Sequence, residues 1–271
     1  MVIARLTVPA FTALMLFGAS AQAADLPHSY GPPPPVVQPE FAGGWYLRGQ
    51  VGVGMNGSIG FETQPMPATA GFATKSIGDS PFIGAGVGYE WNKWLRVDVT
   101  GEYRAKTQVS VLGHYTQPPA PTVFVDTFQG NVSSWVFLAN AYVDLGTWDC
   151  FTPFVGAGIG TAVNTVSDFS DVSPTVPGGP GSSFGVGRGA STWNLAWALY
   201  AGLTYNVSPS FKVDLTYRYL SLGKAKDVID CNGGCGGTSV TIKDLYSNDF
   251  MLGFRWECCE VVPPPPLQSR G

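Results

Sequence analysis

The residues of this chain that could do catalytic chemistry are few. The chain has two histidines and five cysteines among its 271 residues. His114 could lie near Asp79 and Ser80 at one rim of a barrel. Serine, histidine and an acidic residue placed together can form a catalytic triad. A solvated loop histidine with an Asp-Ser turn is the commoner arrangement. We therefore interpret the chain as non-catalytic and keep the rim triad as the alternative.

The cysteines and glycines predict no metal and no cofactor. Cys231 and Cys235 flank the Asn-Gly-Gly turn at residues 232–234, so a local disulfide is the expected state in an oxidising compartment. Zinc would need four ligands, and no other cysteine or histidine lies near them in sequence. Residues 84–88 are rich in glycine but lack the helix start of a dinucleotide-binding motif. A second group of cysteines has no assignable pairing: Cys150, Cys258 and Cys259.

Charged residues form the largest group that could act together. In strand-like segments they recur at every second position, so they share one face of each strand. Thirteen residues make up this predicted lumen charge network: Arg48, Glu90, Arg96, Asp98, Glu102, Arg104, Asp144, Lys212, Asp214, Arg218, Asp249, Arg255 and Glu257. Six positive and seven negative charges nearly balance. Balanced buried charges favour a salt-bridged plug, whereas a selective conduit would favour one dominant sign.

Period-two alternation predicts the strands that must position these charges. Eight segments show it: 45–56, 80–91, 94–104, 134–145, 151–162, 193–207, 211–220 and 247–257. Three connections are very short: 92–93, 146–150 and 208–210. Four are long and are expected to be loops: 57–79, 105–133, 163–192 and 221–246. Short turns at one end and long loops at the other are typical of an outer-membrane barrel.

Aromatic residues fall at the two ends of these segments. Two bands separated by a strand length match the interfacial girdles of a membrane barrel. The predicted girdle tryptophans are Trp45, Trp91, Trp94, Trp135, Trp148, Trp193 and Trp256. A soluble calycin-like barrel, with its apolar face inside, would alternate similarly. The banding and the one-sided loops favour the membrane barrel.

The ends of the chain predict export. Arg5 precedes a mostly apolar stretch at residues 7–19, and Ala-Gln-Ala at 21–23 fits the rule for signal-peptide cleavage. The apolar stretch is too short to span a membrane comfortably. We expect a signal peptide at 1–23, a proline-rich periplasmic linker at 24–43, a barrel at 44–257 and a proline-rich tail at 258–271.

Composition excludes the other classes. Hydrophobic residues make up 45% of the chain and charged residues only 13%, which is too few charges for an ordinary soluble surface. The mean hydropathy of +0.11 is too low for a bundle of membrane helices. A pI near 5.1 argues against a nucleic-acid partner.

The chain resembles the small outer-membrane β-barrel proteins of α-proteobacteria, the porin-family or opacity-like surface antigens. The matching motifs are ADLP at 24–27, WYLRG at 45–49, WLRVD at 94–98, NAYVDLG at 140–146, PFVGAGIG at 153–160 and the closing segment 248–256. Many such chains end on the aromatic residue that closes the last strand, whereas here 15 residues follow Trp256.

Together these observations predict an all-β fold, an eight-stranded antiparallel up-and-down transmembrane β-barrel with four long extracellular loops and short periplasmic turns. The expected location is the outer membrane. The expected role is that of a non-catalytic surface, antigen or adhesion-type protein without a cofactor. Its expected partners are outer-membrane lipid, lipopolysaccharide and host or cell-surface ligands met through the loops. A narrow porin-like channel for small solutes is the alternative.

Overall fold

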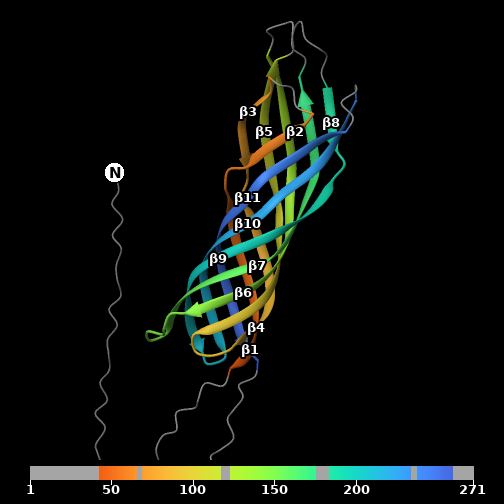
Figure 1. Ribbon diagram of the computed structural model, residues 1–271. Coiled ribbons are helices and arrows are strands. Elements are labelled where there is room, and N and C mark those ends of the chain that lie inside the picture. Colours follow the sequence, from red (N-terminus) through yellow and green to blue (C-terminus); the bar gives the residue numbers. More distant parts are fainter. Residues whose placement is uncertain (1–42, 66–68, 117–122, 175–182, 233–236, 259–271) are drawn as a thin grey trace, which may run out of the picture. The chain divides into compact units, whose positions relative to one another are not determined.

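Eight antiparallel strands form a closed ring in the computed structural model (Figure 1). They are β1 (Gly44–Asn56), β4 (Ser80–Glu90), β5 (Leu95–Thr116), β6 (Val123–Asp144), β7 (Phe151–Ser173), β9 (Ala190–Ser208), β10 (Phe211–Asn232) and β11 (Thr238–Glu257). Each pairs with its neighbours in chain order, and the ring closes where β1 pairs with β11, from Tyr46 opposite Glu257 to Asn56 opposite Ser247. The predicted eight-stranded up-and-down barrel is confirmed.

The structure describes residues 43–65, 69–116, 123–174, 183–232 and 237–258. The chain divides into two units, 1–38 and 39–271, and all the described residues belong to the second. Within these ranges, no helix is long and apolar enough to cross a membrane. The predicted signal peptide, linker and tail lie outside the described residues.

Three short strands continue the barrel wall at the end away from the short turns. They are β2 (Gly60–Gln64), β3 (Gly71–Ile77) and β8 (Ser183–Gly187). Strand β2 pairs with β11, β3 pairs with β5, and β8 lies between β7 and β10. Figure 1 shows them at the top of the barrel, where they take the places of β1, β4 and β9.

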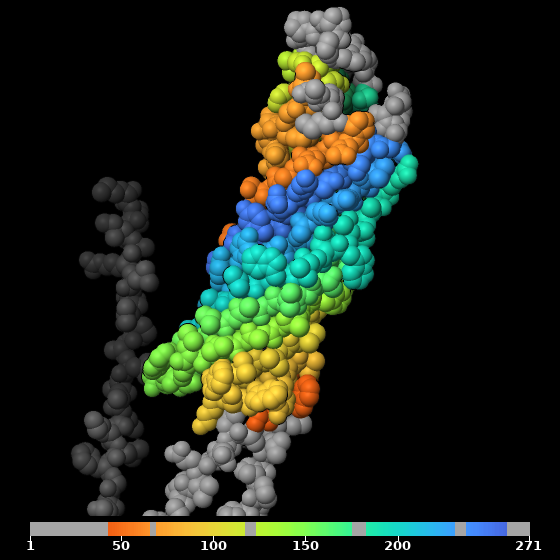
Figure 2. Space-filling model, viewed as in Figure 1, coloured from red at the N-terminus to blue at the C-terminus, as the bar shows by residue number. Residues whose placement is uncertain are grey.

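The expectation of four long loops is wrong in extent. Strand structure occupies much of each predicted loop, because β5, β6, β7, β10 and β11 run well past the expected strand ends and β2, β3 and β8 lie inside the rest. The wall therefore extends beyond the level of the predicted girdles, as Figure 2 shows for the strands that wind obliquely to the upper end. The short turns 91–94, 145–150 and 209–210 lie as expected at the other end.

Bulges explain why the alternation stops where it does. The pairing of β5 with β6 shifts register between Arg104 and Thr107, and that of β10 with β11 shifts around Gly223. Asp168 in β7 and Asp244 in β11 have positive φ angles of 55°. An extra residue in one strand inverts which parity points inward. β5, β7, β10 and β11 therefore continue with the opposite phase, whereas β6 keeps its even-numbered residues inside.

Two chemically different layers fill the barrel. Beside the short turns, the interior holds buried charged side chains such as Arg96, Asp214 and Asp249. Above the bulges the interior is an apolar core that includes Phe61, Val109, Phe128, Phe169 and Ile229. At the level of the bulges the outer wall changes in the opposite sense, from exposed apolar residues to polar ones such as Lys106, Gln129 and Asn131.

Candidate functional site

The densest part of the charge network lies just below the apolar core. Arg218, from β10, donates two hydrogen bonds of 2.8 Å to the carboxylate of Glu102 on β5. Its Nε donates to Asp249 on β11 over 2.7 Å. Arg104 donates to both oxygens of Asp249, over 2.8 and 3.0 Å. All four side chains are at most 2% exposed, so each charge is neutralised within the protein.

A second group of the network surrounds Asp98. The Arg48 guanidinium lies 3.0 Å from the Asp98 carboxylate, and neither side chain is exposed. The hydroxyl of Tyr46 and the amide of Asn140 also donate to Asp98, over 3.0 and 2.7 Å. Arg48 donates a further hydrogen bond of 2.7 Å to the Tyr142 hydroxyl. One buried carboxylate on β5 thus holds donors from two other strands, β1 and β6, in place.

The third group lies beside the short turns. Arg255 is 2.9 Å from both Glu90 and Asp214. Arg96 is 3.2 Å from Asp144, and its guanidinium stacks over the rings of Tyr142 and Phe154 at 4.4 and 4.5 Å. Lys212 pairs with Glu90 and with Glu257. All thirteen residues of the predicted lumen charge network therefore have at least one ion-pair partner.

Glycines make room for these long side chains. A Cβ added to Gly84 would come within 2.8 Å of the Glu102 Cβ, and one added to Gly88 within 2.7 Å of the Asp98 Cβ. Real Cβ atoms essentially never approach so closely. The glycine face of β4 thus supplies the lumen space that the facing charges occupy.

The apolar core seals the network from the far end. Phe61 and Phe128 have ring centroids 5.1 Å apart, and Phe169 lies 6.4 Å from each. A gap of about 10 Å³ lies between this layer and Arg104, which is too small for a water column. In the described residues, side chains therefore fill the interior from the short turns up to the apolar core.

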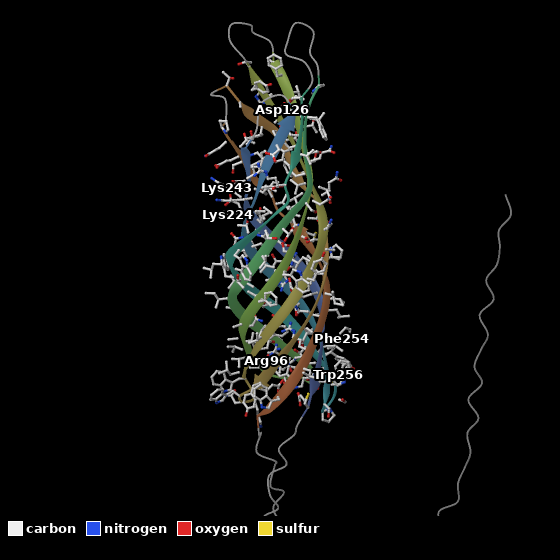
Figure 3. The ribbon with its side chains drawn as sticks, turned by 90° about the vertical axis from the view of Figure 1, so that its right-hand side faces the viewer. Arg96, Asp126, Lys224, Lys243, Phe254 and Trp256 are labelled. Carbon is white, nitrogen blue, oxygen red and sulfur yellow. The ribbon has the colours of Figure 1, made fainter. Side chains whose placement is uncertain are left out.

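The seven predicted girdle tryptophans are all at least half exposed on the outer wall or in turns. Trp45 packs edge-on against Tyr89 with centroids 5.4 Å apart, beside the short turns. Trp135 packs against Tyr103 at 4.9 Å farther along the wall. Exposed apolar residues such as Val99 and Leu215 lie between the ends of the same strands. Figure 3 shows Trp256 and Phe254 on this outer surface, with Arg96 at a similar level.

The candidate catalytic residues do not meet. Ser80 pairs with Gly54 and accepts a hydrogen bond from Arg104, whereas His114 pairs with Gly71 at the other end of β3. Nine strand positions separate Gly71 from Ser80, which is about 30 Å at 3.3 Å per residue. The rim triad is therefore wrong.

The cysteines show no described disulfide. Cys150 and Cys258 are free and exposed near the short turns. The predicted Cys231–Cys235 bridge lies outside the described side chains, as does Cys259. Among the described residues, no group of three or more histidine, cysteine or acidic side chains could hold a metal ion.

Sequence reasoning missed an exposed apolar surface at the upper end, which we call the tip patch. It comprises Leu112, Val123, Val125, Val172, Phe184 and Val186, each between 36% and 53% exposed. Leu112 and Val172 both pair with Thr127, and Val172 pairs with Phe184, so the patch crosses β5 to β8. The residues fell within predicted loops. Their alternation with buried Val111 and Phe124 was the available signal.

A family model for the outer membrane protein β-barrel domain matches residues 10–257. That span includes every strand of the ring. The chain belongs to the outer membrane β-barrel family. Such barrels place their short turns in the periplasm and their longer connections outside the cell, so β2, β3, β8 and the apolar core lie on the extracellular side.

Curated relatives agree with this family. An uncharacterized protein of Brucella abortus is 32% identical over 221 residues, covering 74% of this chain and 76% of the relative. A candidate adhesin of Rickettsia typhi is 28% identical over 187 residues, covering 67% of this chain and 74% of the relative. The outer membrane protein PagN of Salmonella typhimurium is 31% identical over 140 residues, covering 49% and 55%.

Two solved structures that the chain resembles are less similar in sequence than these relatives. OprG of Pseudomonas aeruginosa has a TM-score of 0.48 at 14% identity, covering 81% of this chain and 98% of that one. Neisserial surface protein A has a TM-score of 0.39 at 16% identity, covering 80% and 99%.

Proposed function

We propose that this barrel is a non-catalytic adhesion-type protein that binds a protein surface on another cell through its tip patch. The observation that carries the proposal is the position of the patch. It lies on the outer wall of the extracellular part, separated from the lipid-facing band by polar residues such as Gln129, Asn131 and Lys106. Contiguous apolar side chains exposed to water commonly mark interaction sites.

The similarity to a candidate adhesin of Rickettsia typhi supports this role. The candidate triad does not support a catalytic role, because His114 and Ser80 lie far apart. The strands beneath the patch form a continuous hydrogen-bonded sheet. A preformed surface of this kind loses little conformational entropy on binding.

The lumen charge network is proposed to act as a structural plug and not as a conduit. Each charge has a partner inside the barrel, and the apolar core lies above them. Lipid is the proposed partner of the girdle tryptophans. Lipopolysaccharide is the proposed partner of the exposed Lys224 and Lys226, which lie on the outer wall of β10 just past the outer aromatic residues and can meet its phosphates.

Attachment of bacteria that express the barrel tests the adhesion proposal. We expect the double substitution Val125→Ser, Phe184→Ser to reduce attachment to cultured host cells about tenfold, because central apolar contacts dominate interface energy. Lys106→Gln with Gln129→Ser changes the polar wall below the patch and should leave attachment unchanged. Surface protease accessibility of each variant controls for expression. Equal attachment by the two double variants at equal surface level would overturn the proposal.

A further inference from the structure

A cavity of about 470 Å³ opens at the extracellular end of the barrel, inside the wall. Its floor is Phe72 and Phe128, which belong to or pack on the apolar core. Its walls include Tyr115, Asp126 and Asp171. Figure 3 shows Asp126 near this end of the barrel. The volume lies within the range of about 300–1,000 Å³ that is typical of sites for small organic ligands.

Two carboxylates lie side by side on one wall of the cavity. Thr127 on β6 pairs with Val172 on β7, so the preceding residue, Asp126, lies opposite Ser173. Asp171 is therefore the diagonal neighbour of Asp126 on the same inner face, a separation of about 7–8 Å between Cα atoms. Ser173 donates a hydrogen bond to Asp126. The Oδ1 atom of Asp171 is buried and has no hydrogen-bond partner.

No cation offsets this pair in the described lining. From β5 the cavity receives His114, which is exposed, and Tyr115. The lining residues from β2, β3, β8 and β11 are uncharged, and no described ion pair includes Asp126 or Asp171. Burial, and then the neighbouring Asp126, raise the pKa of Asp171 to about 7 from its ordinary 3.8. The lining of the cavity therefore opposes ionisation of this carboxyl group.

We propose that the cavity binds a small organic cation, an ammonium group attached to an apolar or aromatic body. The ammonium would lie between Asp126 and Asp171 and donate hydrogen bonds to Asp126 and to the unpartnered Oδ1 of Asp171. The apolar body would lie on Phe72 and Phe128. Charge-assisted hydrogen bonds in a partly dry site are the strong ones, and the aromatic floor adds apolar contact and cation–π attraction.

This inference is independent of the adhesion proposal, because the tip patch lies on the outer surface of the barrel whereas the cavity lies inside the barrel. It also differs from a divalent-cation site. Calcium takes about six to eight oxygen ligands, whereas only two carboxylates meet here and no described group of three acidic, histidine or cysteine side chains exists.

The test uses the refolded mature chain and three matched probes, 2-phenylethylamine, 2-phenylethanol and phenylacetate, in isothermal titration calorimetry. We expect the amine to bind more tightly than the alcohol, and phenylacetate to bind least. Asp171→Asn and Asp126→Asn should each weaken amine binding about tenfold, the fold-change expected from losing one charge-assisted hydrogen bond. Asp168→Asn, an exposed carboxylate on the same strand, should leave it unchanged.

Proton linkage gives a readout that a purely structural role would not produce. At pH 7 the ammonium favours the ionised form of Asp171, so binding should release protons and the measured heat should differ between phosphate and Tris buffers. Asp171→Asn should remove most of that difference. Heat-modifiable mobility on gels shows that each variant is folded. The proposal is overturned if the alcohol binds as tightly as the amine, if Asp171→Asn binds normally, or if calcium binds at lower concentration and excludes the amine.

Discussion

Among the described carboxylates of the lumen network, Glu102 accepts four hydrogen bonds, as many as Asp249 and more than the others. It accepts hydrogen bonds from Arg218, Arg104 and Gln50, and it is 2% exposed. Removing it leaves two guanidinium groups to share Asp249 alone. We expect Glu102→Ala to lower the free energy of unfolding by about 3–5 kcal/mol, the usual cost of an uncompensated buried charge, as measured by the urea midpoint of the barrel refolded into lipid vesicles.

Glu62 provides the matched control for this substitution. It pairs with Lys243 on the outer wall, where both side chains are nearly half exposed. Exposed ion pairs contribute about 0–1 kcal/mol, so Glu62→Ala should change the midpoint little. Equal losses from the two substitutions would mean that the lumen charges are hydrated and not paired.

Val99 and Thr100 test which parity of β5 faces lipid. The Val99 side chain is 58% exposed on the outer wall, and Thr100 is 4% exposed in the lumen beside Asn140. Val99→Arg should reduce folding into bilayers, because arginine at the lipid midplane costs about 2–4 kcal/mol. Val99→Leu and Thr100→Ser should fold almost normally. The measurement is the folded fraction on a heat-modifiability gel, and equal fractions for all three variants would contradict this orientation.

At the scale of elements, the bulges divide four of the long strands, β5, β7, β10 and β11, into two parts with different roles. Below them the strand buries charge and exposes apolar residues to lipid. Above them it buries apolar residues and exposes polar ones to water. The register shift after Arg104 and the positive φ of Asp168 mark this change in β5 and β7. The inversion in these strands coincides with the change of surroundings from lipid to water, whereas β6 makes the same change without inverting.

Phe169 tests whether the two layers are separately stable. It is 1% exposed, and a Cβ on Gly130 would clash with its ring. Phe169→Ala should destabilise the apolar core by about 3–5 kcal/mol while the lumen network below keeps its partners. We expect faster trypsin cleavage within the extracellular part and an unchanged protected membrane fragment. Gln129→Ala, an exposed change on β6, should alter neither. Loss of the membrane fragment as well would show that the layers unfold together.

For the whole molecule, the filled interior predicts a closed barrel. Eight strands leave a lumen that side chains alone can fill, and here ion pairs and the apolar core occupy it in succession. Purified protein in planar bilayers should show no steady ion conductance, and Glu102→Ala should not create a large pore. A general porin reconstituted in parallel confirms that the assay detects channels. Steady ion-selective current from the wild-type protein would favour the porin-like alternative.

The parts of the eight strands that cross the membrane could be predicted from the sequence alone. Period-two alternation is local, so the charged parity of residues 95–104 and 211–219 and the aromatic ends were visible without any partner strand. The same reasoning placed the extracellular ends of five strands, β5, β6, β7, β10 and β11, too near the membrane. An extra residue at a bulge breaks the period, and the polar outer face beyond it resembles a loop in sequence although the pairing continues.

Only the tertiary structure decided which residues meet. Arg218 joins Glu102, 116 residues away, and Asp249, 31 residues away, because strand register and the curvature of the closed ring bring three strands to one point in the lumen. It also separated His114 from Ser80 and placed Asp171 beside Asp126. Sequence fixes the face on which a side chain lies, through the two-residue period of the strand. The height of that side chain, and its neighbours across the barrel, depend on register shifts that no single strand contains.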